Sequence, residues 1–103
     1  GKCMKFVFEQ NLQDYMKRKN KTSVVVEVVT SNNSDFEVTE LHVHLEDPKR
    51  ADFFKTKKHF KSHETPEGEV LLPPYRLEYG ETVTFGLKSF LWVKYVTYQG
   101  IRL

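Results

Sequence analysis

The chain has 103 residues, the length of one ordinary domain, and such a chain can bury about two-thirds of the surface that it exposes when unfolded. Sixteen Lys and Arg oppose fourteen Asp and Glu, so the formal net charge is only +2 and does not by itself indicate nucleic acid or membrane. The single cysteine, Cys3, excludes an internal disulfide and favours an intracellular, cytoplasmic location. No apolar run approaches the roughly 20 residues of a membrane-spanning helix. We expect residues 1–103 to be one domain of a larger protein.

The first half of the chain alternates strand patterns with turn-forming residues. Residues 5–9 predict a first strand, and 11–19 fit a short helix and a structured loop equally well. Residues 22–29 contain three successive valines, Glu27 and two more valines, which predicts a central strand buried on both faces. The run 31–35 is dense in Asn, Ser and Asp and predicts a turn between antiparallel strands.

Residues 36–45 predict the next strand, but the apolar side chains change parity along it. Phe36 and Val38 fall on one face, whereas Leu41 and Val43 fall on the other. Because one inserted residue re-phases the alternation, we expect a bulge near residue 39.

The second half begins with a basic insertion at residues 47–64 and continues with short strands. Asp47 and Pro48 are typical of a helix start, so the insertion is predicted to be helical or a loop. Strands are predicted at 69–72, 82–87 and 90–98. The expected fold is mainly β, an antiparallel sandwich of six or seven strands with a short helical insertion.

Two stretches resemble parts of immunoglobulin-like adaptor modules inside cells. Residues 23–36, a hydrophobic strand that runs into Asn32-Asn33-Ser34 and is followed by Phe36-Glu37-Val38, are similar to vesicle-coat appendage and major-sperm-protein-like domains. Residues 77–85 resemble the turn that precedes a late strand in the same group, although Tyr79 stands where such domains often have Pro. The resemblance covers about a quarter of the chain. It implies an immunoglobulin-like sandwich that binds peptides or partner proteins, and it assigns no site residue.

The basic insertion is the first candidate site. Clustered cations beside aromatic rings can hold a phosphate backbone and stack bases, which makes nucleic acid a possible partner. The residues that would do so are Lys55, Lys57, Lys58, Lys61 and Phe60. The alternative is a solvated basic face whose Phe side chains enter the core, and the small net charge favours that alternative.

Large aromatic residues supply the second candidate site, because they are the usual anchors of protein interfaces. The candidates are Tyr75, Trp92 and Tyr95. A lone Trp in a small sandwich is most often a core residue, so we expect Trp92 in the core. Tyr75, which follows Pro73-Pro74, is the better exposed anchor.

Metal and nucleophile chemistry find little support in the sequence. His42 and His44 share one face of a strand, but a metal site needs a third and a fourth ligand, so we predict solvent-facing histidines and no metal. Cys3 lies near a chain end without a fixed base, and no catalytic motif is present. No enzyme activity and no cofactor are predicted.

The sequence thus predicts a protein-protein interaction module that binds a partner segment through a sheet edge or groove. Two alternatives remain, a nucleic-acid-binding domain that uses the basic insertion and a structural domain that dimerises through an edge strand. The oligomeric state is left open.

Overall fold

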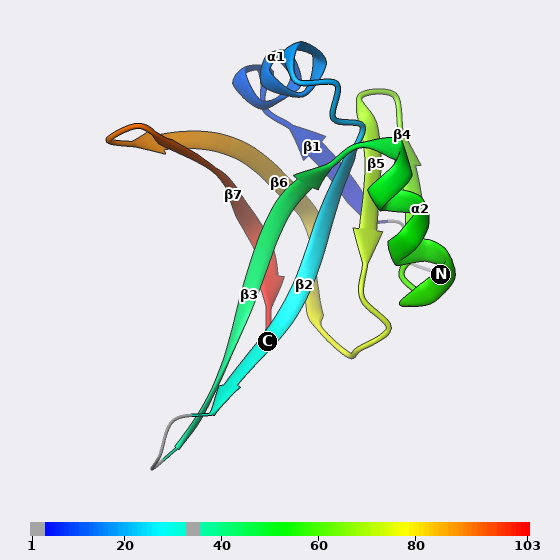
Figure 1. Ribbon diagram of the computed structural model, residues 1–103, viewed down its shortest axis with the longest axis vertical. Coiled ribbons are helices and arrows are strands. Elements are labelled where there is room, and N and C mark those ends of the chain that lie inside the picture. The colour runs from blue at the N-terminus through cyan, green and yellow to red at the C-terminus, as the bar shows by residue number, and fades with distance from the viewer. Residues whose placement is uncertain (1–3, 33–35) are drawn as a thin grey trace.

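The computed structural model describes residues 4–32 and 36–103, and within these ranges the chain forms seven strands and two helices. Figure 1 shows them in the order β1 (Lys5–Phe8), α1 (Gln10–Arg18), β2 (Ser23–Asn32), β3 (Glu37–Glu46), α2 (Pro48–Lys57), β4 (Lys61–Thr65), β5 (Gly68–Leu72), β6 (Glu78–Phe90) and β7 (Val93–Arg102). The predicted mainly-β class is confirmed.

The strands form two sheets with mixed pairing. One sheet has the order β1-β6-β7, and the other has the order β3-β2-β5-β4. β1 runs parallel to β6 and β2 runs parallel to β5, whereas the other pairs are antiparallel. Antiparallel pairing throughout is therefore not confirmed. The two parallel pairs join strands that are distant in the sequence, so burial of their apolar faces and not a hairpin turn brings them together.

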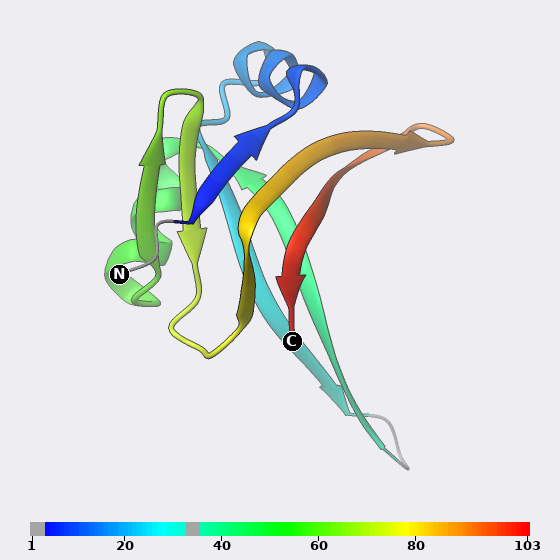
Figure 2. The same cartoon turned by 180° about the vertical axis from the view of Figure 1, so that it is seen from behind.

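Two long hairpins, β2–β3 and β6–β7, extend from the body of the molecule in different directions (Figures 1 and 2). The body lies where the two sheets and the two helices meet, and the C-terminal part of β7 contacts β3 there. The far half of each hairpin therefore has fewer neighbours than the half near the body.

Strand β2 explains how the core is organised. Val24 and Val26 point into the larger hydrophobic cluster, whereas Val25, between them, points into a second cluster beneath α2. All three side chains are fully buried, which confirms the prediction of a central strand with two buried faces. The second cluster is completed by Ala51, Phe54, Phe60 and Leu71.

Helix α2 begins as the sequence predicts. The Asp47 Oδ1 atom accepts a hydrogen bond of 2.9 Å from the backbone N–H of Arg50, and Pro48 occupies the first helical position. The predicted insertion at 47–64 divides, however, into α2 and the edge strand β4. His59 separates them with a φ of 59°, which turns the chain back towards β5.

Two local predictions are wrong. Strand β3 has no bulge near residue 39, because its pairing with β2 runs without a shift from Ser23↔Glu46 to Asn32↔Glu37. The apolar residues of β3 change face near residue 39 because the outer part of the β2–β3 hairpin is not buried. In that part of the strand, the alternation of apolar residues therefore does not indicate which face packs on the core. The register shift lies instead in β6, between Tyr79 and Thr84. Of the predicted turn at 31–35, Ser31 and Asn32 belong to β2, and residues 33–35, like Cys3, lie outside the described residues.

The second wrong prediction concerns residues 90–98. They do not form one strand, because the chain turns at Leu91 and Trp92 and thereby joins β6 to β7. The sequence has neither Gly nor Asn at this point, so the usual signal for a tight hairpin is missing.

Gly100 permits the close approach of β7 to the irregular part of β6. It has a φ of 90°, and a Cβ atom here would lie 2.3 Å from the backbone O of Thr82. We expect Gly100→Ala to lower the free energy of unfolding by about 2 to 4 kcal/mol, measured by urea denaturation. Gly80→Ala is the control, since its Cβ atom would meet nothing closer than 3.7 Å. Equal losses for both variants would contradict this account.

Candidate functional site

A groove of about 390 Å³ lies where the end of α2, the middle of β2 and the β5–β6 connection meet. We call it the Tyr75 groove. Its walls are formed by Glu27, Val28, Lys57, Lys58, His59, Phe60, Pro74 and Tyr75. The fold thus brings together Tyr75 from one predicted site with Lys57, Lys58 and Phe60 from the other.

Tyr75 stands on the rim of this groove as an exposed aromatic side chain. Its exposed fraction is 61%, as expected for an interface anchor. The position follows from the sequence. Pro73 and Pro74 end β5 because proline has no backbone N–H for strand pairing, and the chain therefore enters a connection that carries Tyr75 before β6 begins. Tyr75 therefore offers an apolar ring and a hydroxyl group at the groove.

The cations of the groove come from the C-terminal end of α2. Lys57 is the last residue of the helix, Lys58 follows as its C-cap, and both are exposed. The Lys58 Nζ atom lies 5.5 Å from the centre of the Phe54 ring. On the opposite wall, the Oε1 atom of Glu27 lies 2.9 Å from His44 Nε2, so this carboxylate already has a partner. The groove therefore presents an excess of positive charge.

The rest of the basic insertion is placed differently. Lys55 Nζ is 3.0 Å from Glu69 Oε2, and Lys61 lies on the edge strand β4 outside the groove. Phe60 has an exposed fraction of only 8%, and its ring packs at 5.2 Å against that of Phe54. The Phe60 ring is thus part of the core and is not available for stacking on a base.

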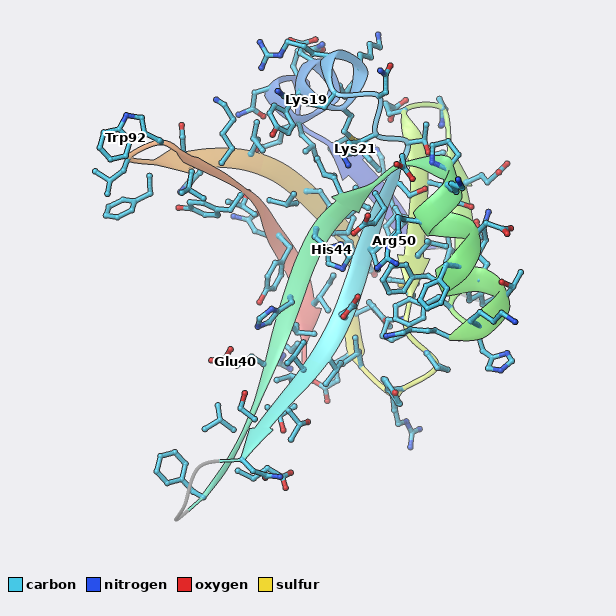
Figure 3. All side chains as sticks on the ribbon, in the orientation of Figure 1. Lys19, Lys21, Glu40, His44, Arg50 and Trp92 are labelled. Atoms are coloured by element: carbon cyan, nitrogen blue, oxygen red, sulfur yellow. The ribbon has the colours of Figure 1, made fainter. Side chains whose placement is uncertain are left out.

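Trp92 and Tyr95 lie far from Tyr75. Both belong to the β6–β7 hairpin, and Trp92 stands at its far end (Figure 3). The expectation of a core position for Trp92 is wrong, since 91% of the residue is exposed. The turn at Leu91 and Trp92 is the reason, because it places Trp92 at the end of the β6–β7 hairpin, beyond the buried part of that sheet.

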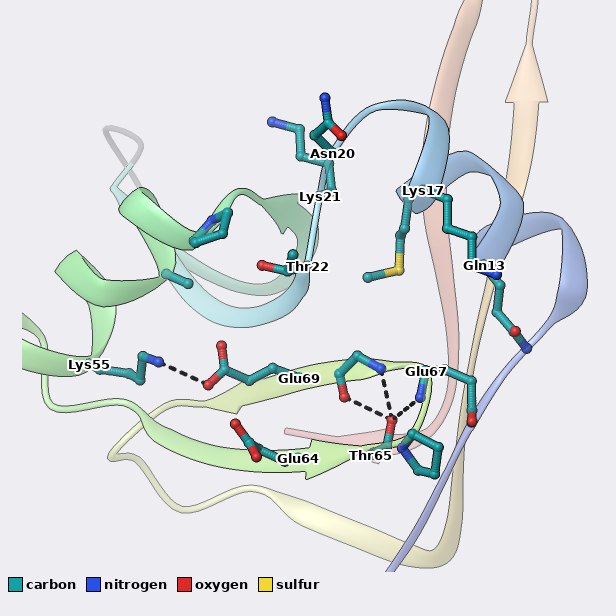
Figure 4. A pocket seen from close by; sticks show the side chains of 15 residues that line it. Gln13, Lys17, Asn20, Lys21, Thr22, Lys55, Glu64, Thr65, Glu67 and Glu69 are labelled. Atoms are coloured by element: carbon teal, nitrogen blue, oxygen red, sulfur yellow. Dashed lines mark hydrogen bonds and ion pairs between the residues drawn. The ribbon is translucent and has the colours of Figure 1, made fainter.

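A larger cleft of about 680 Å³ lies between the α1–β2 connection, α2 and the β4–β5 turn (Figure 4). It carries both signs of charge in similar number, with Lys17, Lys21 and Lys55 against Glu64, Glu67 and Glu69. The Lys55–Glu69 ion pair, dashed in Figure 4, satisfies two of these charges internally. This cleft therefore offers no excess charge for a ligand.

Glu69 is the polar centre of this region and joins four elements. Ser23 Oγ of β2 donates to its Oε1 atom at 2.7 Å, and Ser62 of β4 and Lys55 of α2 donate to its Oε2 atom. Partial burial by itself raises the pKa of Glu69, but these hydrogen bonds and the Lys55 charge together outweigh it and hold the pKa below the ordinary value of 4.5. The ionised carboxylate is thus part of the folded structure.

The two strand histidines are bound by carboxylates. His42 Nε2 lies 3.2 Å from Glu40 Oε2, whereas His44 contacts Glu27 through Nε2 and Glu46 through Nδ1, at 2.9 and 2.7 Å. His44 is thus half-buried and not simply solvent-facing as predicted. Within residues 4–32 and 36–103, no group of three or more His, Cys, Asp or Glu side chains could hold a metal ion.

Comparisons with known proteins give no relative. No protein-family model, no curated protein and no solved structure matches the chain. In the part of the chain that the structure describes, no helix is long and apolar enough to cross a membrane.

Two residues important to these surfaces have no clear signal in the sequence. His59 closes the groove because of its positive φ, and Leu91 forms the hairpin turn with a φ of 58°. Neither position has the Gly or Asn that usually marks such a backbone. The lysines that flank the apolar run 90–93 are the one available hint that this run is a tip and not a core strand.

The Glu69 cluster gives a pH-dependent prediction. Glu69→Gln should lower the free energy of unfolding at pH 7 by about 1 to 3 kcal/mol. The NH₂ group of glutamine cannot accept a hydrogen bond, so at least one of the three groups that donate to Glu69 would lose its acceptor. A folded-state pKa below the unfolded value means that the carboxylate stabilises the protein above about pH 4.5 and that this stability is lost as the pH falls further. The difference between the variant and wild type should therefore shrink in acid, as urea denaturation at several pH values would measure.

Glu67→Gln is the matched control, since Glu67 lines the same cleft but its side chain has no hydrogen bond among the described residues. A pH-independent loss in both variants would argue against the role of the Glu69 carboxylate.

Proposed function

We propose that this chain is a non-catalytic protein-interaction module that holds an acidic, extended segment of a partner protein in the Tyr75 groove. The observation that carries the proposal is the convergence of Tyr75 with Lys57 and Lys58 in one groove. Tyr75 supplies an exposed aromatic anchor, and the two lysines supply charge for acidic side chains on either side of the anchored residue.

The chemistry of the walls supports binding more than catalysis. The groove contains one histidine and a carboxylate that is already paired with His44, but no Ser, Thr or Cys side chain that could act as a nucleophile. The volume of about 390 Å³ suits one large side chain of a partner segment together with its backbone.

The resemblance to immunoglobulin-like adaptor modules is a second, weaker support. The two-sheet architecture is compatible with a β-sandwich, and the immunoglobulin-like type remains our prediction. We further propose that the module works inside the cell, in keeping with its single cysteine.

Selection of peptides from a random library on the immobilised chain tests the groove. We expect the selected peptides to combine an aromatic or large aliphatic residue with Asp or Glu. Tyr75→Ser should weaken their binding at least about 10-fold in a fluorescence anisotropy titration, because it removes the anchor. Lys57→Glu with Lys58→Glu should weaken it to a similar extent, and increasingly so at low salt.

Two control variants localise the effect. Tyr95→Ser removes an exposed tyrosine on the hairpin, and Lys49→Glu with Lys61→Glu reverses two charges outside the groove. Both should leave peptide binding unchanged. The proposal would be wrong if no peptide were selected and the chain bound single-stranded RNA tightly instead. In that case Lys57→Glu with Lys58→Glu should abolish RNA binding while Tyr75→Ser leaves it intact, and the partner would be nucleic acid.

A further inference from the structure

The far end of the β6–β7 hairpin is a second exposed surface, separate from the Tyr75 groove. We call it the apolar tip and define it as Phe90, Leu91, Trp92, Val93 and Tyr95. Each of these residues is exposed, from 45% for Tyr95 to 91% for Trp92. Figure 3 shows Trp92 at the extremity of the hairpin, away from both helices and from the other sheet. Five neighbouring exposed apolar side chains are unusual for a chain with a buried core.

The turn itself indicates that folding does not require these residues. Leu91 has a φ of 58°, in the left-handed region that Gly and Asn tolerate and that a branched side chain resists. Leu and Trp together occupy the two-residue turn, where Asn-Gly or Gly-X would be ordinary. The tip thus holds large apolar groups where small polar ones would give a more stable hairpin.

The part of the hairpin that carries the tip has charge of one sign. From Thr82 to Gly100 the sequence has no Asp or Glu, and its two charged residues are Lys88 and Lys94. The Nζ atom of Lys94 lies 5.9 Å from the Tyr15 ring of helix α1, and Arg18 and Lys19 lie 5.7 and 6.0 Å from the same ring. None of these four cations takes part in an ion pair within the described ranges.

The register of the hairpin sets the distance between the apolar and the basic groups. Phe90 pairs with Val93, Ser89 with Lys94, and Lys88 with Tyr95, so the lysines lie one and two residues behind the last pair. Two residues of a strand span about 6 to 7 Å. Apolar groups at a membrane surface enter to a depth of about 5 to 10 Å, where basic groups behind them meet the lipid phosphates.

We propose that the apolar tip inserts into the surface of an anionic phospholipid bilayer, with Lys88, Lys94 and the cations of α1 bound to the headgroups. Trp92 and Tyr95 suit this position because amphipathic rings favour the headgroup level.

The part of the hairpin next to the tip carries only positive charge, and the nearest carboxylates are Glu9, which lies against Gly86, and Asp14 of α1. Positive charge next to the apolar residues favours an anionic lipid surface over an uncharged protein pocket. This inference uses a different surface from the Tyr75 groove and does not depend on it.

Trp92 is the one tryptophan of the chain, so its fluorescence reports on the tip alone. The wild-type chain is titrated with vesicles of phosphatidylcholine and with vesicles that also contain phosphatidylserine. We expect the Trp92 emission to shift to the blue and to be quenched by brominated acyl chains, with much stronger binding to the anionic vesicles. An unshifted emission with the anionic vesicles at low salt would overturn the proposal.

Charge variants separate the local cations from the net charge. Lys88→Gln with Lys94→Gln should lower the vesicle partition coefficient about 30-fold, since each lysine near an anionic surface contributes about fivefold. Lys57→Gln with Lys58→Gln changes the net charge equally but acts at the groove, and it should leave the partition coefficient nearly unchanged. Equal losses in both pairs would overturn the assignment to the tip.

Leu91→Asn tests insertion without the risk of unfolding. Asn tolerates a positive φ, so the variant should unfold at the same or a higher urea concentration than wild type. The variant also keeps Trp92 as the fluorescent probe. Its vesicle binding should nevertheless fall at least about 10-fold, because an apolar side chain is lost from the inserted surface. Unchanged binding by Leu91→Asn would show that the chain adheres by charge only and would overturn insertion.

Discussion

Burial of β2 on both faces is the constraint on which the rest of the structure depends. Val24 and Val26 face the larger cluster while Val25 faces the cluster under α2, so one strand connects two hydrophobic cores. The strand must therefore be internal to its sheet, and it lies between β3 and β5. Beside it, Ser23 is fully buried and donates to Glu69, which ties the same strand to α2 and β4. The Tyr75 groove is built on the same strand, since Glu27 and Val28 of β2 line it.

The elements that could be predicted are those that a short run of residues determines by itself. Three successive valines indicate two-sided burial, and Asp47-Pro48 marks a helix start, so β2 and α2 were accessible from the sequence. The parallel pairing of β1 with β6 could not be predicted from the sequence, because it depends on contacts between residues about 75 positions apart and no local pattern indicates it. The turn at Leu91 and Trp92 was missed for the opposite reason, since its residues contradict the usual turn chemistry.

The candidate site could be predicted only in pieces. The sequence offers Tyr75 as an exposed anchor and Lys57 and Lys58 as members of a basic cluster, but nothing local shows that they face one another. That meeting depends on His59, whose positive φ ends the helix, and on the two prolines that direct the β5–β6 connection. Phe60 shows the limit of composition, because a basic segment rich in Phe fits both stacking and core packing, and only burial decides between them.

The apolar tip and the Tyr75 groove lie at different ends of the molecule, the tip at the end of the β6–β7 hairpin and the groove beside α2 and the β5–β6 connection (Figures 1 and 2). Occupation of one surface therefore does not cover the other. The hairpin is a two-stranded extension beyond the shared core, so its tip can enter a soft surface without disturbing β2. With the tip in lipid, the groove would remain in water and free to hold a partner segment, which is the arrangement that an adaptor at a membrane surface requires.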